Sequence, residues 1–414
     1  MATGVNDSSW DAVEYKITRL DIKYGKSTAN INTGQIQNFY IEKDFDNDTF
    51  PIFLMNIAMS EDMYRYICRN GNDTVFTIVI QTEVNDGSSN KTKRSMFITD
   101  KFVPLGLDDT GYTGENMDKK AKSTKVSDLN EQTVDMFNQN FTFILVRDKD
   151  IRCSKKIINK VLTETALTDA VGYLLTKGDA KRVLMTALDN TRTYNELVLL
   201  PLSLIEQLHY LNSFYGFYKE GAQIFFDFDR LYILKNTAKC TAYESNEIQT
   251  VTFKVYGKDN GSNFSSGSYQ DNVNKKAYIK ASSMEIIDAT KVVDSTVGTN
   301  SIILDSSGNT INTSSTDDGN SNIVSTISHN PYLKSEAQLR SKELKNVVTI
   351  SCSDINMNLL KPNRQYKIIS TESKISAQTN GYYRLKSMVS FFSKNGDGFR
   401  INTQVTLVNT GSSK

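Results

Sequence analysis

The chain has 414 residues, of which 39% are hydrophobic and 23% are charged, with 48 basic and 47 acidic side chains. This length exceeds that of one ordinary domain and favours two or three. The formal net charge of +1 argues against a dedicated nucleic-acid-binding protein, which would need a basic surface to displace counterions.

Membrane and export signals are absent from the sequence pattern. No run of 18 apolar residues occurs, and the start "MATGVNDSSW" lacks the basic and apolar regions of a secretory signal. The four cysteines are far apart and form no C-x-x-C pair; they are Cys68, Cys153, Cys240 and Cys352. We therefore expect single buried thiols in a reducing compartment, and no structural zinc cluster.

Residues 10–165 are predicted to be mostly strands. "VEYKITRLDIKY" (13–24) alternates apolar and polar residues, as do parts of "TVFTIVIQTEV" (74–84) and "FTFILVRDKD" (141–150). The segment 60–71 predicts one short helix that ends at Gly71. Residues 106–133 are polar and lysine-rich, and we expect a long surface loop there.

Residues 154–221 change to a helical pattern. One predicted helix ends at Gly178 and has an apolar stripe of Leu167, Val171, Leu174 and Leu175. A second short helix is expected over residues 179–190. A third follows Pro201, with a capping box at Ser203 and Glu206 and a shared apolar face of Leu204, Leu208 and Leu211.

Strands return from about residue 240. They are predicted in 247–257 and 275–281 and, after a helix over 334–345, in 346–355, 382–394 and 398–408. In the last strand, Ile401, Thr403, Val405 and Leu407 share one face. Between these strands, 26 of the 35 residues from 296 to 330 are Gly, Ser, Thr, Asn or Asp, too polar to bury a core, so a solvated loop is expected.

The order of elements predicts an α+β fold that is mainly β. We expect a β-rich unit over residues 1–153, a mixed α/β unit over 154–240 and a second β-rich unit over 241–414. Polar insertions at 106–133 and at about 258–330 interrupt the two β-rich units. The similar character of the two ends favours copies of one barrel type.

The stretch "QIFFDFDRLYIL" (223–234) is the strongest candidate for catalysis. Asp227 and Asp229 follow an apolar strand, as do the nucleophile and the acid/base of magnesium-dependent haloacid-dehalogenase phosphatases. Those enzymes usually have Thr or Val where this chain has Leu231, and they continue with βα units rather than strands. The one downstream match to the further acidic pair of those enzymes, Asp317 and Asp318, lies in the polar segment. Strand alternation instead predicts that Phe226 and Phe228 face a core, while Asp227 and Asp229 face water.

Other candidate sites are weaker. Asp44, Asp46 and Asp48 have the spacing of the first three calcium ligands in a helix–loop–helix site, but Thr49 and Met55 replace the required Gly and Glu. A turn between strands is therefore predicted. His209 is expected on a helix face, and His329 borders the polar segment, so neither supports a histidine-dependent hydrolase. We expect no catalytic, cofactor-binding or metal site.

The run from residue 175 to 234, with "YNELVLLPLSL", "YGFY", "FFDFD" and "YIL" in order, resembles the middle of baseplate central hub proteins of contractile-tailed bacteriophages. Residues 49–80 and 330–368 are similar to parts of the hub barrels. The two polar insertions depart from a compact hub.

This resemblance implies a fold and a role. It implies two tube-type antiparallel β-barrels around the α/β unit, and a homotrimeric ring that joins the hexameric tail tube to the trimeric central spike or tail lysin. It further implies neighbouring wedge and tape measure proteins, a conduit for DNA without specific binding, and no membrane contact or cofactor. The protein would be synthesised in the host cytoplasm and would reside in the virion baseplate. Another tail adaptor, such as a wedge or distal tail protein, and the phosphatase that uses Asp227 and Asp229 are the alternatives.

Overall fold

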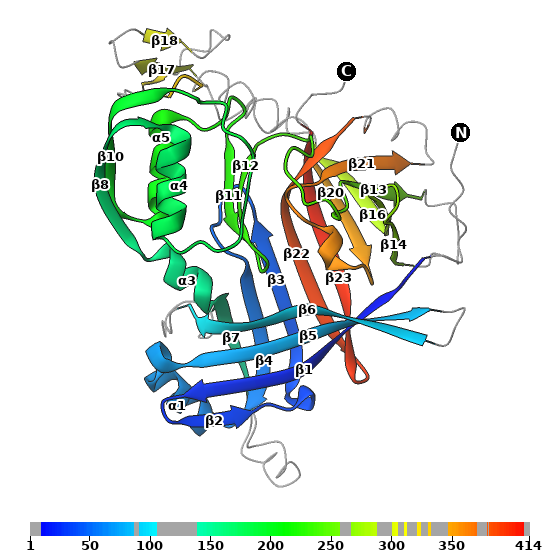
Figure 1. The fold of residues 1–414 in the computed structure, drawn as a ribbon. Coiled ribbons are helices and arrows are strands. Elements are labelled where there is room, and N and C mark those ends of the chain that lie inside the picture. The colour runs from blue at the N-terminus through cyan, green and yellow to red at the C-terminus, as the bar shows by residue number, and fades with distance from the viewer. Residues whose placement is uncertain are drawn as a thin grey trace.

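Most of the described chain is β-structure in one large sheet, shown in the computed structural model of Figure 1. The structure describes residues 10–86, 91–105, 139–256, 266–287, 300–304, 310–312, 321–323, 330–332, 347–370, 379 and 381–409. The predicted fold class, α+β and mainly β, is confirmed. None of the helices in these ranges is long and apolar enough to span a bilayer.

A closed antiparallel barrel of eight strands forms the lower part of the molecule (Figure 1). Six of its strands come from the N-terminal part of the chain: β1 (Val13–Tyr24), β3 (Ile36–Asp44), β4 (Ile52–Met59), β5 (Val75–Asp86), β6 (Lys91–Pro104) and β7 (Gln139–Arg147). The last two come from the other end: β22 (Tyr383–Asn395) pairs with β3, and β23 (Gly398–Asn409) pairs with β1. The pairing of β22 with β23 closes the ring, which we call the first ring.

Two small elements complete this end of the molecule. The strand β2 (Ser27–Asn30) pairs with β1. The predicted helix over 60–71 is confirmed as α1 (Glu61–Arg69), where the Ser60 hydroxyl accepts a hydrogen bond from the Met63 amide at the N-terminus.

A second ring uses the same hairpin. Its other strands are β13 (Thr250–Val255), β15 (Lys276–Ala281), β16 (Ser283–Ile287), β20 (Val347–Ser353) and β21 (Gln365–Ser370), with β14 (Ser268–Asp271) added beside β15. Only Ser282 separates β15 from β16, so this stretch pairs with β13 at one end and with β20 at the other, which closes the second ring. In contrast to the expected all-antiparallel barrel, β13 runs parallel to both β15 and β21.

The hairpin β22–β23 is therefore shared by two rings, where we expected one barrel from each end of the chain. Near the turn, Ser387–Ser393 pair with β3; at the open end, Asn402–Val408 pair with β20. The strands have 13 and 12 residues, long enough to serve both rings. The predicted alternation of β23 is confirmed, because Ile401, Thr403, Val405 and Leu407 are all buried. Unit boundaries near residues 153 and 240 stay a prediction.

The middle segment has a core of its own. In Figure 1 the helices α4 (Leu167–Lys177) and α5 (Leu204–Tyr215) lie between the ribbon of β8 (Ile157–Ala166) and β10 (Thr193–Ser203) and the sheet of β9 (Val183–Met185), β11 (Ala222–Phe226) and β12 (Leu231–Lys235). Both long helix predictions are confirmed, including the capping box of Ser203 and Glu206. The helix expected over 179–190 is wrong, because Val183–Met185 pair in parallel with β12. The helix α3 (Asp148–Ser154) and the ribbon strands were not predicted.

The polar insertions lie mainly outside the described residues. The loop predicted at 106–133 and the helix predicted at 334–345 are outside them. Within 296–330, where a loop was expected, three short strands pair with one another: β17 (Asn300–Leu304), β18 (Thr310–Asn312) and β19 (Ser321–Ile323).

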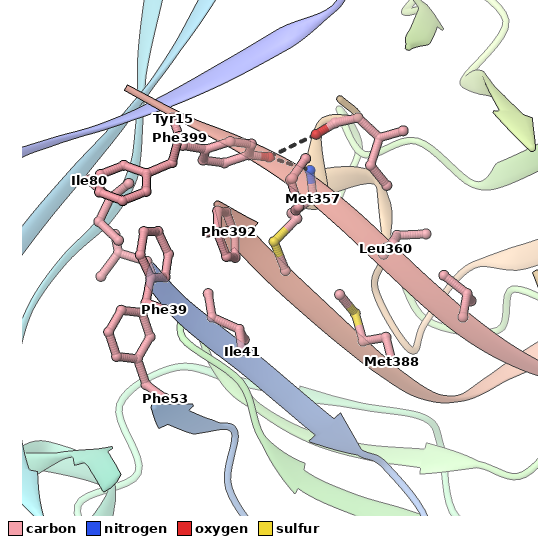
Figure 2. Packing of buried hydrophobic residues seen from close by; sticks show 14 of the residues in the cluster. Tyr15, Phe39, Ile41, Phe53, Ile80, Met357, Leu360, Met388, Phe392 and Phe399 are labelled. Carbon is pink, nitrogen blue, oxygen red and sulfur yellow. Dashed lines mark hydrogen bonds between the residues drawn. The ribbon is translucent and has the colours of Figure 1, made fainter. Parts of the chain in front are cut away.

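Tyr15 connects the cores of the two rings (Figure 2). Its side chain is fully buried, with its ring edge-on to Phe392 at a centroid distance of 5.0 Å. The hydroxyl donates a hydrogen bond to the Ile355 carbonyl and accepts one from the Met357 amide, both at 2.9 Å. The strand β1 of the first ring is thereby attached to the 355–357 segment of the second.

Replacing Tyr15 with phenylalanine is expected to lower the free energy of unfolding by about 1–3 kcal/mol, because the Met357 amide loses its partner in a buried site. Chemical denaturation of the purified variant measures this change. Tyr40→Phe is the matched control: Tyr40 is half-buried, its ring packs against Phe391 in a tilted arrangement, and its hydroxyl forms no hydrogen bond with the described residues. Equal losses in both variants would contradict a specific role for the Tyr15 hydroxyl.

Candidate functional site

The tip of the β11–β12 hairpin is the place where the middle segment meets both rings. The strand β11 ends at Phe226, and the Asp227 amide donates to the Arg230 carbonyl at 2.9 Å, so residues 227–230 form a turn. Phe225 packs edge-on against Phe45, and Phe226 stacks on Phe50, both just outside strands of the first ring. The tip therefore inserts between the two β-rich parts of the chain.

Asp227 is fully buried, which corrects the expectation that it faces water. One carboxylate oxygen accepts from Lys43 Nζ at 2.6 Å and from the Phe228 amide at 2.7 Å; the other lies 3.2 Å from Lys361 Nζ. Lys43 belongs to β3 of the first ring, and Lys361 precedes β21 of the second. The expectation failed because alternation applies only inside a strand, and Asp227 is the first residue of the turn.

Asp229 is less enclosed than Asp227. Its side chain is 27% exposed, and it lies 3.2 Å from Lys361 Nζ and 3.1 Å from Arg230 Nε. Arg230 in turn pairs with Glu244 and Glu247 at 2.9 and 3.1 Å. Asp229 therefore extends the charged network toward the surface, in partial agreement with the prediction that it faces water.

Arg147 binds the tip from the other side. This guanidinium is 2% exposed, forms two 2.6 Å hydrogen bonds to Asp150, and donates to the carbonyls of Asp227 and Phe228. Burial raises the pKa of Asp150 to about 6, against the opposing effect of Arg147. These contacts attach α3 to the turn.

The turn between β3 and β4 is attached in the same way. Asp46 holds Arg384 of β22 through two hydrogen bonds of 2.8 and 2.9 Å, and it accepts a third from Gln223 of β11 at 2.9 Å. Asp44 instead accepts from the amides of Asp46 and Asn47. The turn predicted for this segment is confirmed, and its carboxylates bind the protein itself rather than converging as calcium ligands.

Opposing effects set the charge of Asp227. Burial alone would raise the pKa of this carboxyl, but the ammonium groups of Lys361 and Lys43, together with the hydrogen bonds from Lys43 and Phe228, hold it well below its ordinary value. Burial lowers the pKa of Lys43, and Asp227 offsets part of that effect. We call this set, Asp227 with Lys43, Lys361, Arg147 and Asp150, the charged joint.

The joint predicts a specific response to acid. Since the folded-state pKa of Asp227 is lowered, its contribution to stability is present above the unfolded value of about 3.9 and is lost as the pH falls through the folded value. The difference in unfolding free energy between the wild type and Asp227→Asn should therefore narrow between about pH 5 and pH 3. Urea titrations across this range test it. The exposed control Asp397→Asn should show no such narrowing, and a constant difference for Asp227→Asn would contradict the assignment.

The geometry does not suit a phosphoryl-transfer nucleophile. Both oxygens of Asp227 are occupied by lysines or a backbone amide, and the side chain has no exposed surface. The other sequence candidates are not brought near it: His209 is exposed on α5, as predicted for a helix face, while His329, Asp317 and Asp318 lie outside the described residues.

The cysteines form no disulfide bond with one another, as predicted, but only Cys352 is buried; Cys68, Cys153 and Cys240 are half-buried. Burial raises the pKa of Cys153 to about 11 and that of Cys352 to about 12, so these thiols are poor nucleophiles near neutral pH.

Sequence reasoning missed the basic members of the joint, although one signal was present. Phe39, Ile41 and Lys43 alternate on the inward face of β3, which places a lysine where a core residue is expected. A buried lysine requires a buried carboxylate. Its partner Asp227 is 184 residues away, so the pair itself cannot be read from local spacing.

Comparisons with known proteins agree with this fold. The protein-family model described as bacteriophage PBS1 gene 109 protein matches residues 12–410. The structure of the tail protein from Neisseria meningitidis is 11% identical with a TM-score of 0.51, covering 96% of this chain and 97% of that one. At this identity the likeness concerns the fold alone.

Two further structures are less similar. The 43 kDa tail protein of prophage MuSo2 from Shewanella oneidensis is 9% identical with a TM-score of 0.48, covering 95% of this chain and 97% of that one. An E. coli component of the type VI secretion system, described as similar to T4 bacteriophage tail proteins, is 7% identical with a TM-score of 0.42, covering 94% of this chain and 76% of that one. No curated protein matches the chain.

Proposed function

Because the chain belongs to the bacteriophage PBS1 gene 109 protein family and shares the fold of a tail protein, we propose that it is the central hub of a contractile-tail baseplate. In this role, three copies form a ring between the hexameric tail tube and the trimeric central spike or tail lysin. The ring surrounds a conduit for DNA, and wedge and tape measure proteins are its further neighbours. The protein then resides in the tail baseplate of the virion.

The observation that carries the proposal is the presence of two strand rings joined by one hairpin in a single chain. Three copies carry six rings, which matches a hexameric tube, while the trimer as a whole keeps the threefold symmetry of a spike. Closed cyclic symmetry with paired units is a direct way to join sixfold and threefold assemblies.

The charged joint supports this role in a second way. A hub must keep its two rings at a fixed angle, or the six units would not meet the tube together. Lys43, Asp227 and Lys361 join the first ring, the hairpin tip and the second ring through contacts of 2.6–3.2 Å. A buried, multiply paired carboxylate fixes such an arrangement because any shift leaves a charge unpaired.

The near-zero net charge also fits a conduit. Strong attraction between DNA and the wall would slow its passage, and a chain with a formal charge of +1 has no large excess of positive charge to cause it.

We expect the purified chain to be a trimer, either alone or on addition of its tail-tube or spike neighbour. Native mass spectrometry and analytical ultracentrifugation would give a species of three times the chain mass. A wedge or distal tail adaptor would instead give another stoichiometry. A monomer that neither neighbour changes would refute the ring.

A further inference from the structure

A pocket of about 540 Å³ lies beside the charged joint, between α3, residues 178–182 and the tip of the β11–β12 hairpin. Its volume is within the usual range of ligand sites. Phe226 and Leu231 are buried at its floor, with half-buried Cys153 and Ala180 beside them. Three buried charged residues also line the pocket: Arg147 and Asp150 pair with each other, and Arg230 pairs with Asp229, Glu244 and Glu247. Phe226 and Leu231 therefore form the apolar part of the floor.

The rim of this pocket is basic. Five exposed cations surround it: Lys149, Arg152, Lys156, Lys181 and Arg182. Two of them are paired with carboxylates outside the pocket lining, Lys149 with Asp100 and Arg152 with Asp148, each at 2.5 Å.

The other three rim cations have too few partners. Lys156 and Lys181 share the single carboxylate of Asp179, at 3.8 and 4.0 Å. Arg182 forms no ion pair within the described part of the chain. The other lining carboxylates, Asp150 and Asp229, are paired with Arg147 and with Arg230 and Lys361. Three positive charges therefore face the single carboxylate of Asp179, and this side of the rim can accept about two more carboxylates.

We propose that this pocket binds an acidic peptide segment of a neighbouring protein. An apolar side chain of that segment covers Phe226 and Leu231, and flanking carboxylates meet Lys156, Lys181 and Arg182. Charge complementarity selects an acidic partner. A free phosphate fits less well, because the buried arginines of the lining, Arg147 and Arg230, are already paired with carboxylates. A phosphate would also leave Phe226 and Leu231 uncovered.

Fluorescence anisotropy with the purified full chain tests the proposal, whatever its oligomeric state. The probe is the pentapeptide Asp-Glu-Phe-Asp-Glu-amide with an uncharged fluorophore on its N-terminus, at low salt, and its uncharged counterpart is Asn-Gln-Phe-Asn-Gln-amide with the same fluorophore. The variant Lys181→Ser with Arg182→Ser removes two rim charges; Lys181 is 80% exposed, so folding should be unaffected. The matched control, Lys23→Ser with Lys26→Ser, removes two exposed charges from the region of β1 and β2.

The proposal expects saturable binding of the acidic peptide only, weakened about tenfold in the rim variant and unchanged in the control. Added salt should weaken it as well. Three outcomes would overturn it: no binding, equal weakening by the control variant, or complete displacement of the peptide by equimolar inorganic phosphate. A failed binding test with an intact trimer would leave the hub proposal untouched, because the trimer is measured independently of peptide binding.

Discussion

Asp227→Asn is expected to lower the free energy of unfolding by about 3–5 kcal/mol, because it leaves the ammonium of Lys43 buried and without its carboxylate. Lys43 is 3% exposed at its side chain and cannot turn to water without opening the joint. Lys361 keeps a second carboxylate partner, Asp229. Most of the expected loss of unfolding free energy therefore comes from Lys43. Chemical denaturation of the purified variant gives the value.

Asp229→Asn is the matched control for this prediction. Its carboxylate is partly exposed, and Arg230 keeps Glu244 and Glu247, so we expect a loss of no more than about 1 kcal/mol. Lys43→Met combined with Asp227→Asn should cost much less than the sum of the single changes, since the two residues form one unit. If Asp227→Asn and Asp229→Asn lowered the free energy of unfolding by small and equal amounts, Asp227 would instead face solvent, as strand alternation predicts.

Phe392→Ala should be comparably severe, at about 3–5 kcal/mol. Phe392 is fully buried on β22, stacks on Phe39 at 4.1 Å and contacts Tyr15 edge-on. Because β22 belongs to both rings, the loss is expected to spread across them. Hydrogen exchange should therefore show weaker protection in β5 of the first ring and in β13 of the second.

The neighbouring Phe391 supplies the control for Phe392. It faces the other side of β22, is half-buried and packs against Tyr40 at 4.7 Å. Phe391→Ala should lower the free energy of unfolding clearly less than Phe392→Ala does, because removal of a half-buried side chain leaves only a small cavity. Loss of protection confined to the first ring in Phe392→Ala would mean that the rings unfold independently.

Elements whose signal is local were predictable from the sequence. The helix α5 follows from its capping box and apolar face, and β23 follows from seven residues of strict alternation. Both signals act over a few residues and need no distant partner. The overall character, mainly β with a helical middle, is the sum of such local signals.

Features that depend on distant pairing were not predictable. Residues 179–190 look helical by composition, but Val183–Met185 become a strand because β12, almost 50 residues later, offers an edge. The closure of the first ring by β22 and β23 likewise depends on segments from opposite ends of the chain. Tertiary context overrides weak local preference in such cases.

The candidate site shows the same division. Two acids after an apolar strand suggested a nucleophile, and alternation suggested a solvent-facing pair; neither anticipated a buried structural carboxylate. The deciding partners, Lys43 and Lys361, are 184 and 134 residues from Asp227. Only the inward register of Lys43 gave a local hint.

The shared hairpin also constrains how the protein is made. The edges of β1 and β3 leave the ribosome early, but the strands that cover them begin at Tyr383. At 5–20 residues per second, translation from residue 44 to 383 takes roughly 20–70 s, during which both edges lack their final partners. Open edges recruit other strands. Nascent chains should therefore depend on chaperones until late in synthesis, and rapid overproduction should favour aggregation over assembly.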